Sequence, residues 1–259
     1  MTIMKRIAVV LVVVVAVTCV FGAASSTVVP ETEAVSHMES RNRQPGRGDG
    51  IFGDYWWANR FLSRYNRIME WRGKTVDVVM LGDSIVHFWE WHHPESWARF
   101  CGRRRVLNLG YGGDRTQQVI WRIENGELDG YTAKNVVLLI GTNNNSAQDT
   151  KPENVVKGIA KIVAMIRAKQ PKANVVLMAI FPRGRNAESK LHAAARGRND
   201  ATNVLLKEYA AAEKIVYLDI NARLVDESGW VPETIMKDEV HPTAAGYDIW
   251  MEELSKVVK

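Results

Sequence analysis

The chain has 259 residues, of which 46% are hydrophobic and 24% are charged, and its formal net charge is +5 at pH 7. This is the composition of an ordinary globular protein, and the length suits one domain of about 200 residues with additional segments. The charge is too small to indicate a nucleic-acid-binding protein, so the arginine clusters are expected to be solvated surface.

The N-terminus has the pattern of a secretory signal, which we assign to residues 1–26. Lys5 and Arg6 precede an apolar run over residues 7–21, and small residues follow it, in the order typical of such signals. A retained membrane anchor is the alternative, although the run is short for a span of about 20 residues. We expect export to the periplasm or the extracellular space, with no stable membrane partner after cleavage.

The two cysteines, Cys19 and Cys101, cannot form a disulfide in the mature chain, because Cys19 lies inside the predicted signal. Lipid attachment at Cys19 is a weaker alternative, since the residues before it make a poor processing site. The stability of the mature protein therefore has to come from packing.

Residues 27–53 mix polar residues with Gly and Pro, show no apolar period, and are predicted to be a flexible lead-in to a domain over residues 54–259. From there helical and strand-like patterns alternate. Helices are expected over residues 54–71, 85–100, 116–124, 152–166, 198–213 and 243–258, and strands over residues 77–81, 106–109, 135–140, 174–181 and 215–220.

The predicted strands are almost continuously apolar, which is typical of parallel strands covered on both faces. Five such strands separated by helices predict an α/β fold, a three-layer α/β/α sandwich with the flavodoxin-like strand order 2-1-3-4-5. In such sheets ligands bind beyond the carboxyl ends of the strands where the order reverses, here between the first and third strands.

Polar residues follow both of these strands. Gly82-Asp83-Ser84 ends the first, and Gly141-Thr142-Asn143-Asn144 ends the third. Ser84 either caps the next helix or acts as a nucleophile. A serine hydroxyl attacks an acyl carbon poorly unless an imidazole accepts its proton and a carboxylate orients the imidazole.

Of the six histidines, His241 stands out because Asp238 lies three residues before it in the loop ahead of the last helix. In a turn, a carboxylate at that spacing can reach Nδ1 of the ring and leave Nε2 free. The alternative is that Asp238 caps a helix and His241 lies on the surface. His92 and His93 lack further ligands at suitable spacing, so we predict no metal and no cofactor.

An acyl-transfer site also needs hydrogen-bond donors for the oxyanion. Gly112-Gly113 follows the second strand, where missing side chains let backbone N–H groups approach a ligand, and Asn143 supplies an amide. With the N–H of Ser84, three donors could converge. Alternatively, the glycines make only a tight turn and Asn143 caps a loop.

Four blocks, "GDS", "GYGGD", "GTNN" and "DEVHP", occur in this order at strand ends and resemble the SGNH or GDSL hydrolases. Within that family, the longer run "NLGYGGDRTQQVIWRIENGEL" and the later "FPRG" are most similar to the catalytic subunits of platelet-activating-factor acetylhydrolase and their bacterial relatives.

The resemblance implies a catalytic triad of Ser84, His241 and Asp238, with Ser84 as nucleophile, His241 as general base and Asp238 as its orienting acid. It also implies an oxyanion hole made by the N–H groups of Ser84 and Gly113 and the side chain of Asn143.

We expect a serine esterase that hydrolyses short-chain, chiefly acetyl, esters of a small-molecule or glycan substrate. Acetylated carbohydrates are the first hypothesis. Acetylhydrolase or lysophospholipase-type action on short-acyl lipids is one alternative, and a non-catalytic secreted carbohydrate-binding protein is another. No nucleic-acid partner is expected, and the sequence predicts no oligomeric state. Faces for sugar stacking are expected from Trp56, Trp57, Trp89, Trp91 and Trp230.

Overall fold

A five-stranded parallel sheet in the order β2-β1-β3-β4-β5 forms the centre of the computed structural model, which describes residues 30–36, 56–147 and 150–258. The predicted fold class and strand order are confirmed. The strands are β1 Thr75–Gly82, β2 Val106–Gly110, β3 Thr132–Leu139, β4 Asn174–Met178 and β5 Val216–Leu218.

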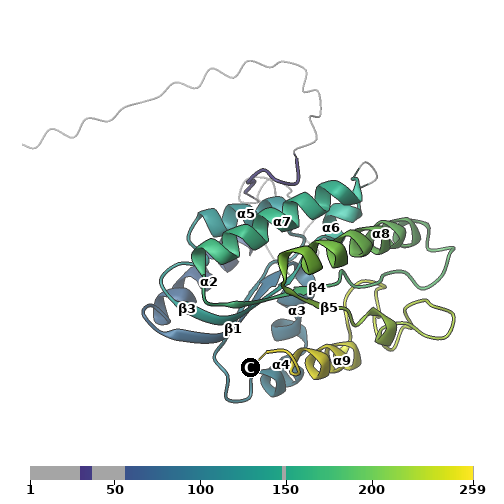
Figure 1. Cartoon of the computed structure of the whole chain (residues 1–259). Helices are drawn as coiled ribbons and strands as arrows, with labels where there is room; N and C mark the ends of the chain where they lie inside the picture. Colours follow the sequence, from purple (N-terminus) through teal and green to yellow (C-terminus); the bar gives the residue numbers. More distant parts are fainter. Residues whose placement is uncertain (1–29, 37–55, 148–149, 259) are drawn as a thin grey trace, which may run out of the picture.

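Helices cover both faces of this sheet (Figure 1). One layer is formed by α5, α7 and α8, and the other by α3, α4 and α9. The helices are α2 Trp56–Glu70, α3 Ser84–His92, α4 Pro94–Cys101, α5 Thr116–Glu124, α6 Thr142–Asn145, α7 Pro152–Lys169, α8 Lys190–Glu213 and α9 Ala244–Leu254, with a 3-10 turn, η1, at Asn221–Arg223.

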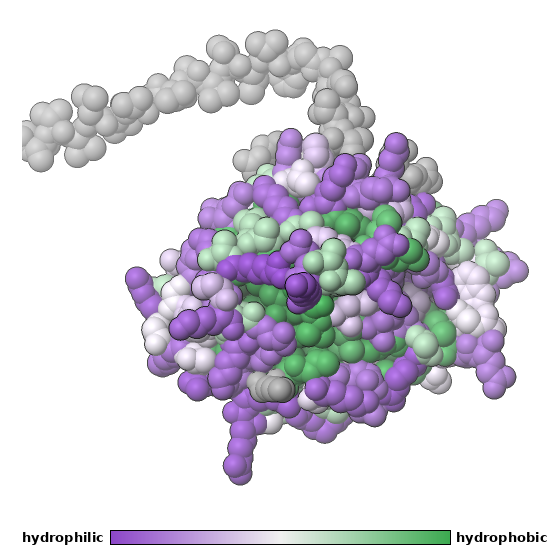
Figure 2. All heavy atoms as spheres, viewed as in Figure 1, coloured by the Kyte–Doolittle hydropathy of each residue, from purple (hydrophilic) through white to green (hydrophobic). Residues whose placement is uncertain are grey.

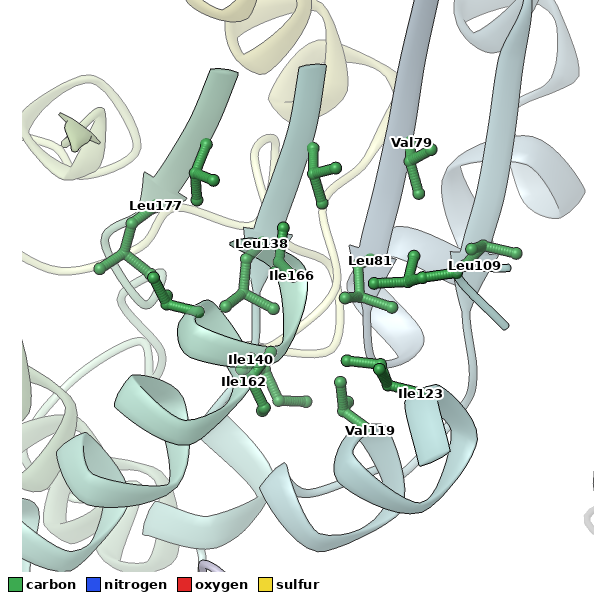
Figure 3. Close-up of a cluster of buried hydrophobic side chains, with 14 of the residues drawn as sticks. Val79, Leu81, Leu109, Val119, Ile123, Leu138, Ile140, Ile162, Ile166 and Leu177 are labelled. Carbon is green, nitrogen blue, oxygen red and sulfur yellow. The ribbon is translucent and has the colours of Figure 1, made fainter. Parts of the chain in front are cut away.

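Side chains of β1 alternate between the two layers, as the pleat of a strand requires. Val79 and Leu81 belong to the core beneath α5 and α7, whereas Val78 and Met80 belong to the core beneath α3, α4 and α9. Figure 3 shows the first of these cores, where side chains of α5 and α7 meet those of the strands. Because both faces of the strand are buried, its sequence is apolar at nearly every position.

Polar residues cover most of the face shown in Figure 2. The apolar residues that remain visible gather near its centre, between the two helical layers. The visible surface thus follows the layered arrangement of the fold.

The predicted helix over residues 85–100 is two helices, α3 and α4, which meet at His93. Pro94 has no N–H to donate, and it disfavours helical geometry at the residue before it. His93 accordingly has φ −131° and ψ 56°. The structure also adds α6, begins α8 at Lys190 and limits β5 to three residues.

Residues 30–36, within the predicted lead-in, lie against α5 and α7. Thr116 Oγ1 donates to the Glu31 carbonyl at 2.8 Å, and Lys161 Nζ donates to the Thr32 carbonyl at 3.0 Å. The predicted signal over residues 1–26 lies outside the described residues and stays a prediction. Among the described helices, none combines the length and the apolar character needed to cross a membrane.

Helix α3 packs so closely on β2 that Gly110 has no room for a side chain. A Cβ at Gly110 would lie 2.3 Å from the backbone nitrogen of His87 and 2.6 Å from Cβ of Val86. Both distances are much shorter than van der Waals contact. The absence of a side chain at Gly110 therefore allows α3 to lie this close to the end of β2.

We expect Gly110→Ala to lower the free energy of unfolding by about 1–3 kcal/mol, because overpacking forces the helix away from the sheet. Gly197→Ala is the matched control, since no atom lies within 4 Å of its Cβ position. In α8 that change should be neutral or stabilising by up to about 1 kcal/mol. Urea unfolding measures both, and a Gly110→Ala protein as stable as wild type would contradict the packing argument.

Candidate active site

Ser84 is the first residue of α3, two positions after β1 ends at Gly82. Asp83 caps the helix, since its Oδ1 accepts a hydrogen bond from the N–H of Ile85 at 2.9 Å. Ser84 therefore does not serve as the cap. Its side chain lies at the positive end of a helix, where developing negative charge is favoured.

His241 lies between Ser84 and Asp238. Its Nε2 is 2.8 Å from Ser84 Oγ, and its Nδ1 is 2.6 Å from Asp238 Oδ2. The structure thus brings together the three side chains that the sequence singled out, from opposite ends of the domain. A hydroxyl, an imidazole and a carboxylate in this order can activate the hydroxyl as a nucleophile.

The loop before α9 holds the His241 ring through the Asp238 carboxylate. Asp238 Oδ1 also accepts hydrogen bonds from the backbone N–H groups of Val240 at 3.1 Å and His241 at 2.7 Å. Burial tends to raise the pKa of Asp238, but the hydrogen bonds and charge of His241 and the backbone N–H bonds together hold it well below its usual value. The carboxylate therefore stays ionised beside the ring at neutral pH.

The turn after β2 lies beside the start of α6. Gly113 has φ +73°, a left-handed conformation that favours glycine. Asn143 Nδ2 donates to the carbonyl of Asp114 at 2.9 Å, which fixes its amide against this turn. Among the described residues, no acceptor pairs with the backbone N–H of Ser84 or of Gly113.

A fully buried cluster of three charged side chains, Asp114, Arg122 and Glu127, holds this turn from the interior of the domain. Asp114 Oδ2 accepts from Arg122 Nε at 2.9 Å, and Arg122 also pairs with Glu127. The same guanidinium donates to the carbonyls of Leu109 at 3.1 Å and Gly82 at 3.2 Å, at the ends of β2 and β1. Burial tends to lower the pKa of Arg122, but the two carboxylates outweigh it and raise that pKa.

The loop after β4 holds both polar loops of the site, a role that the sequence did not reveal. Arg183 Nη1 donates to Ser146 Oγ at 2.6 Å and to Thr142 Oγ1 at 3.3 Å, next to α6. The N–H of Arg185 donates to Glu239 Oε2 at 3.0 Å, beside Asp238. The sequence shows only that Arg183 and Arg185 follow the end of a strand, and no known spacing pattern assigns such a pair a role.

Two of the five tryptophans expected to offer faces for sugars are core residues. Trp57 and Trp89 are fully buried. Trp57 donates to Asp114 Oδ1 at 2.8 Å, and Trp89 stacks on Trp250 at a centroid distance of 4.8 Å. The expectation was wrong for these two because large aromatic residues bury more area in the core than at a rim. Trp56, Trp91 and Trp230 keep exposed area.

No group of three or more His, Cys, Asp or Glu side chains is placed to hold a metal ion in the described part of the chain. His92, one of the two histidines considered for a metal, instead stacks on Phe88 at 4.5 Å.

The sequence of this chain is similar to those of known proteins. The sequence pattern of the GDSL-like lipase/acylhydrolase family matches residues 80–249. The alpha2 subunit of platelet-activating factor acetylhydrolase IB from Rattus norvegicus is 33% identical over 205 residues, which cover 78% of this chain and 83% of that protein.

Solved structures share the fold. A GDSL-like lipase from Bacteroides thetaiotaomicron matches with a TM-score of 0.62 at 22% identity, covering 78% of this chain and 95% of that one. An acetyl xylan esterase matches with a TM-score of 0.57 at 15% identity, covering 70% of this chain and 99% of that one.

Asp83 generates a prediction about pH. Burial raises the pKa of its carboxyl to about 7. Between about pH 4 and 7 the folded protein holds a proton that the unfolded chain releases, so this group makes stability fall as pH rises through that window. Asp83→Asn keeps an oxygen to cap α3 and removes the titration.

We expect the unfolding free energy of wild type to fall from pH 5 to pH 8 by at least about 1 kcal/mol more than that of Asp83→Asn. Urea unfolding of both proteins at the two pH values gives the difference, in which the other titrating groups cancel. Parallel pH dependences would show that Asp83 is ionised in the fold throughout.

Proposed function

This chain belongs to the GDSL-like lipase/acylhydrolase family, and we propose on that basis that it is a serine esterase that cleaves short-chain, chiefly acetyl, esters through an acyl-enzyme. The observation that carries the proposal is the pair of contacts made by His241, 2.8 Å to Ser84 Oγ and 2.6 Å to Asp238 Oδ2. Ser84 is the nucleophile, His241 the general base, and Asp238 orients the ring.

In the first half-reaction Ser84 Oγ attacks the ester carbonyl while its proton passes to His241 Nε2. The ionised Asp238 carboxylate holds Nδ1–H and stabilises the imidazolium that forms. The tetrahedral intermediate then collapses, and the alcohol leaves with the proton returned by His241. The acyl group remains on Ser84 as an ester.

The negative oxygen of the intermediate is held by the N–H groups of Ser84 and Gly113 and by the Asn143 amide. The two N–H groups have no acceptor among the described residues, and Asn143 Nδ2 uses one of its two protons on Asp114. Donors that are fixed before the charge develops lower the barrier without reorganisation during the reaction.

In the second half-reaction His241 removes a proton from water, and the hydroxide attacks the acyl carbon. The same donors hold the second intermediate, which collapses to free acid and restores the Ser84 hydroxyl. No step requires a group beyond these side chains, backbone N–H groups and water.

We favour acetylated carbohydrates as substrates. Trp91 is 44% exposed and lies two turns along α3 from Ser84, so it offers an aromatic face near the nucleophile. The flat faces of sugars stack on such rings, while the polar residues around them suit hydroxyl groups.

An acetylhydrolase acting on short-acyl lipids is the second candidate. It is favoured by the 33% identity to a subunit named platelet-activating factor acetylhydrolase. A carbohydrate-binding protein without turnover is less well supported, because the contacts between Ser84, His241 and Asp238 would have no purpose in it.

We expect Ser84→Ala to reduce ester hydrolysis by several orders of magnitude, on the order of 10⁴–10⁶, the loss found when a nucleophile of this kind is removed. Release of acetate from p-nitrophenyl acetate, acetylated xylan, acetylated sialic acid and an acetyl phospholipid is the measurement. Serine-dependent activity on glycans supports the favoured substrate, and a preference for the phospholipid supports the second candidate. An undiminished Ser84→Ala enzyme contradicts the mechanism.

Asn143→Ala should lower kcat by about 10²–10³ with little change in KM, because the amide acts on the transition state more than on the ester. Asn125→Ala is the matched control, since Asn125 also donates to a backbone carbonyl, that of Trp121 at 2.8 Å, but from an exposed site after α5. It should leave kcat unchanged. Equal rates for Asn143→Ala and wild type would remove Asn143 from the oxyanion site.

A further inference from the structure

A hollow of about 490 Å³ lies between α2 and α3. Its wall combines aromatic rings, cationic side chains and uncharged polar groups. The residues that line it are Trp56, Asn59, Arg60, Ser63, Arg64, His87, Glu90 and Trp91. None of these belongs to the catalytic arrangement described above.

The hollow begins one helical turn from the proposed nucleophile. His87 follows Ser84 by three residues on α3, so their Cβ atoms are about 5–6 Å apart. Phe88 contacts the His241 ring at a centroid distance of 4.7 Å, and Trp91 in turn contacts Phe88 at 6.2 Å. Trp91, at the exposed end of the hollow, thus lies seven residues or about 10 Å along α3 from Ser84, a distance that a short oligosaccharide spans.

Arg60 extends from α2 to the end of β2, and only part of its guanidinium is hydrogen-bonded there. Its Nε donates to the Gly110 carbonyl at 2.6 Å, and its Nη2 donates to Asn108 Oδ1 at 3.1 Å. Within the described ranges its Nη1 has no acceptor and no carboxylate forms an ion pair with it. Both hydrogen-bond partners are neutral, so they orient the cation without neutralising it, and its charge is opposed only by contact with the Tyr111 ring and by the more distant Glu90 among the described residues.

The second arginine is partly compensated. Arg64 Nη1 pairs with Glu90 Oε2 at 3.1 Å. His87 adds no charge, because burial, together with the charge of Arg60, lowers its pKa to about 2. Two arginines and one glutamate leave the hollow with an excess of one positive charge.

An aromatic platform lies beside this charge. The Trp91 ring stacks on His87 at 5.6 Å with an interplanar angle of 17°, and Trp56 stacks on His87 at 6.2 Å with an angle of 23°. Stacking fixes the orientation of the Trp91 ring, which is 44% exposed. The amide of Asn59 and the hydroxyl of Ser63 add hydrogen-bonding groups to the same wall.

We propose that this hollow is a subsite for a carboxylate-bearing sugar, a uronic acid residue of the acetylated glycan on which Ser84 acts. Arg60 binds the carboxylate, Trp91 stacks on the sugar ring, and Asn59 and Ser63 bind its hydroxyl groups. The proposal rests on the esterase function proposed above and narrows its substrate class to acidic glycans.

The lining favours a sugar acid over the head group of a phospholipid. A phosphocholine group carries no net charge, because its ammonium offsets its phosphate, so it gains less from the excess positive charge than a uronate does. The alkyl chain would also need a continuous apolar channel, whereas five of the eight described residues that line the hollow, Asn59, Arg60, Ser63, Arg64 and Glu90, are polar or charged.

The test compares an acetylated oligo-uronide with its carboxyl-reduced, neutral counterpart. We expect wild type to show a KM at least about tenfold lower for the acidic substrate, with similar kcat, as for one charged hydrogen-bonded contact. Arg60→Gln should raise KM for the acidic substrate by about 10- to 100-fold and abolish the preference. Arg60→Lys should restore part of it.

Arg67→Gln is the matched control, since Arg67 is an exposed arginine of the same helix that pairs with Glu70 at 2.6 Å, and it does not line the hollow. It should keep the full preference. Trp91→Ala, which truncates an exposed side chain, should raise KM for both substrates, and it keeps the test valid if Arg60→Gln fails to fold. Equal KM values for the two substrates in wild type would overturn the proposal.

A binding measurement separates this proposal from the esterase function. The unacetylated oligo-uronide is titrated calorimetrically into Ser84→Ala protein at low and high salt. Salt-sensitive binding that Arg60→Gln abolishes supports the subsite even if wild type releases no acetate from any ester. Acetate release without such binding keeps the esterase and overturns the subsite, as does an Arg60-dependent preference for an acetyl phospholipid.

Discussion

The guanidinium of Arg122 is completely buried, and the positions of three parts of the candidate active site depend on it. It donates to the carboxylates of Asp114 and Glu127, and also to the carbonyls at the ends of β1 and β2. The end of β1 carries Ser84, and the Asp114 turn carries Gly113 and holds Asn143. Removing one partner of such a buried group costs about 3–5 kcal/mol, because the remaining charge stays unpaired.

This arrangement explains how Ser84, the proposed nucleophile, and the proposed oxyanion donors are supported by one rigid cluster, although they follow three different strands. Short polar turns cannot hold a geometry by themselves, since few contacts restrain them. Here the turns are fixed from inside by Arg122 and from the other side by Arg183, which bonds to residues of α6. Binding energy is then available for the transition state, because the donors need no reordering.

The sequence predicted the sheet order and the contact of Asp238 with His241 because each depends on a local signal. The contact of His241 with Ser84, 157 positions away, was implied by the family resemblance instead. Apolar runs mark buried strands, and a carboxylate three residues before a histidine reaches it within one turn. Their roles in catalysis stay a proposal. The break between α3 and α4 could also have been predicted from Pro94 alone. Because the sequence analysis did not use this proline, it predicted one helix where the structure has two.

The parts that escaped prediction depend on residues far apart in the chain. Arg60 meets Gly110 across 50 positions and Arg122 meets Gly82 across 40, and no spacing rule covers such pairs. The tryptophans failed for a related reason, since composition shows an aromatic residue but not its burial. Trp57 and Trp91 look alike in the sequence, yet one is fully buried and the other is 44% exposed.

The contact between His241 and Ser84 joins residues 157 positions apart, across almost the whole sheet in chain order. Contacts of such long sequence separation form late in folding, after the entropy of closing the intervening chain has been overcome. The loop of His241 also leads directly into α9, which begins three residues later. During synthesis Ser84 is thus present long before His241, and the hydroxyl gains its imidazole partner only when the loop before α9 has docked.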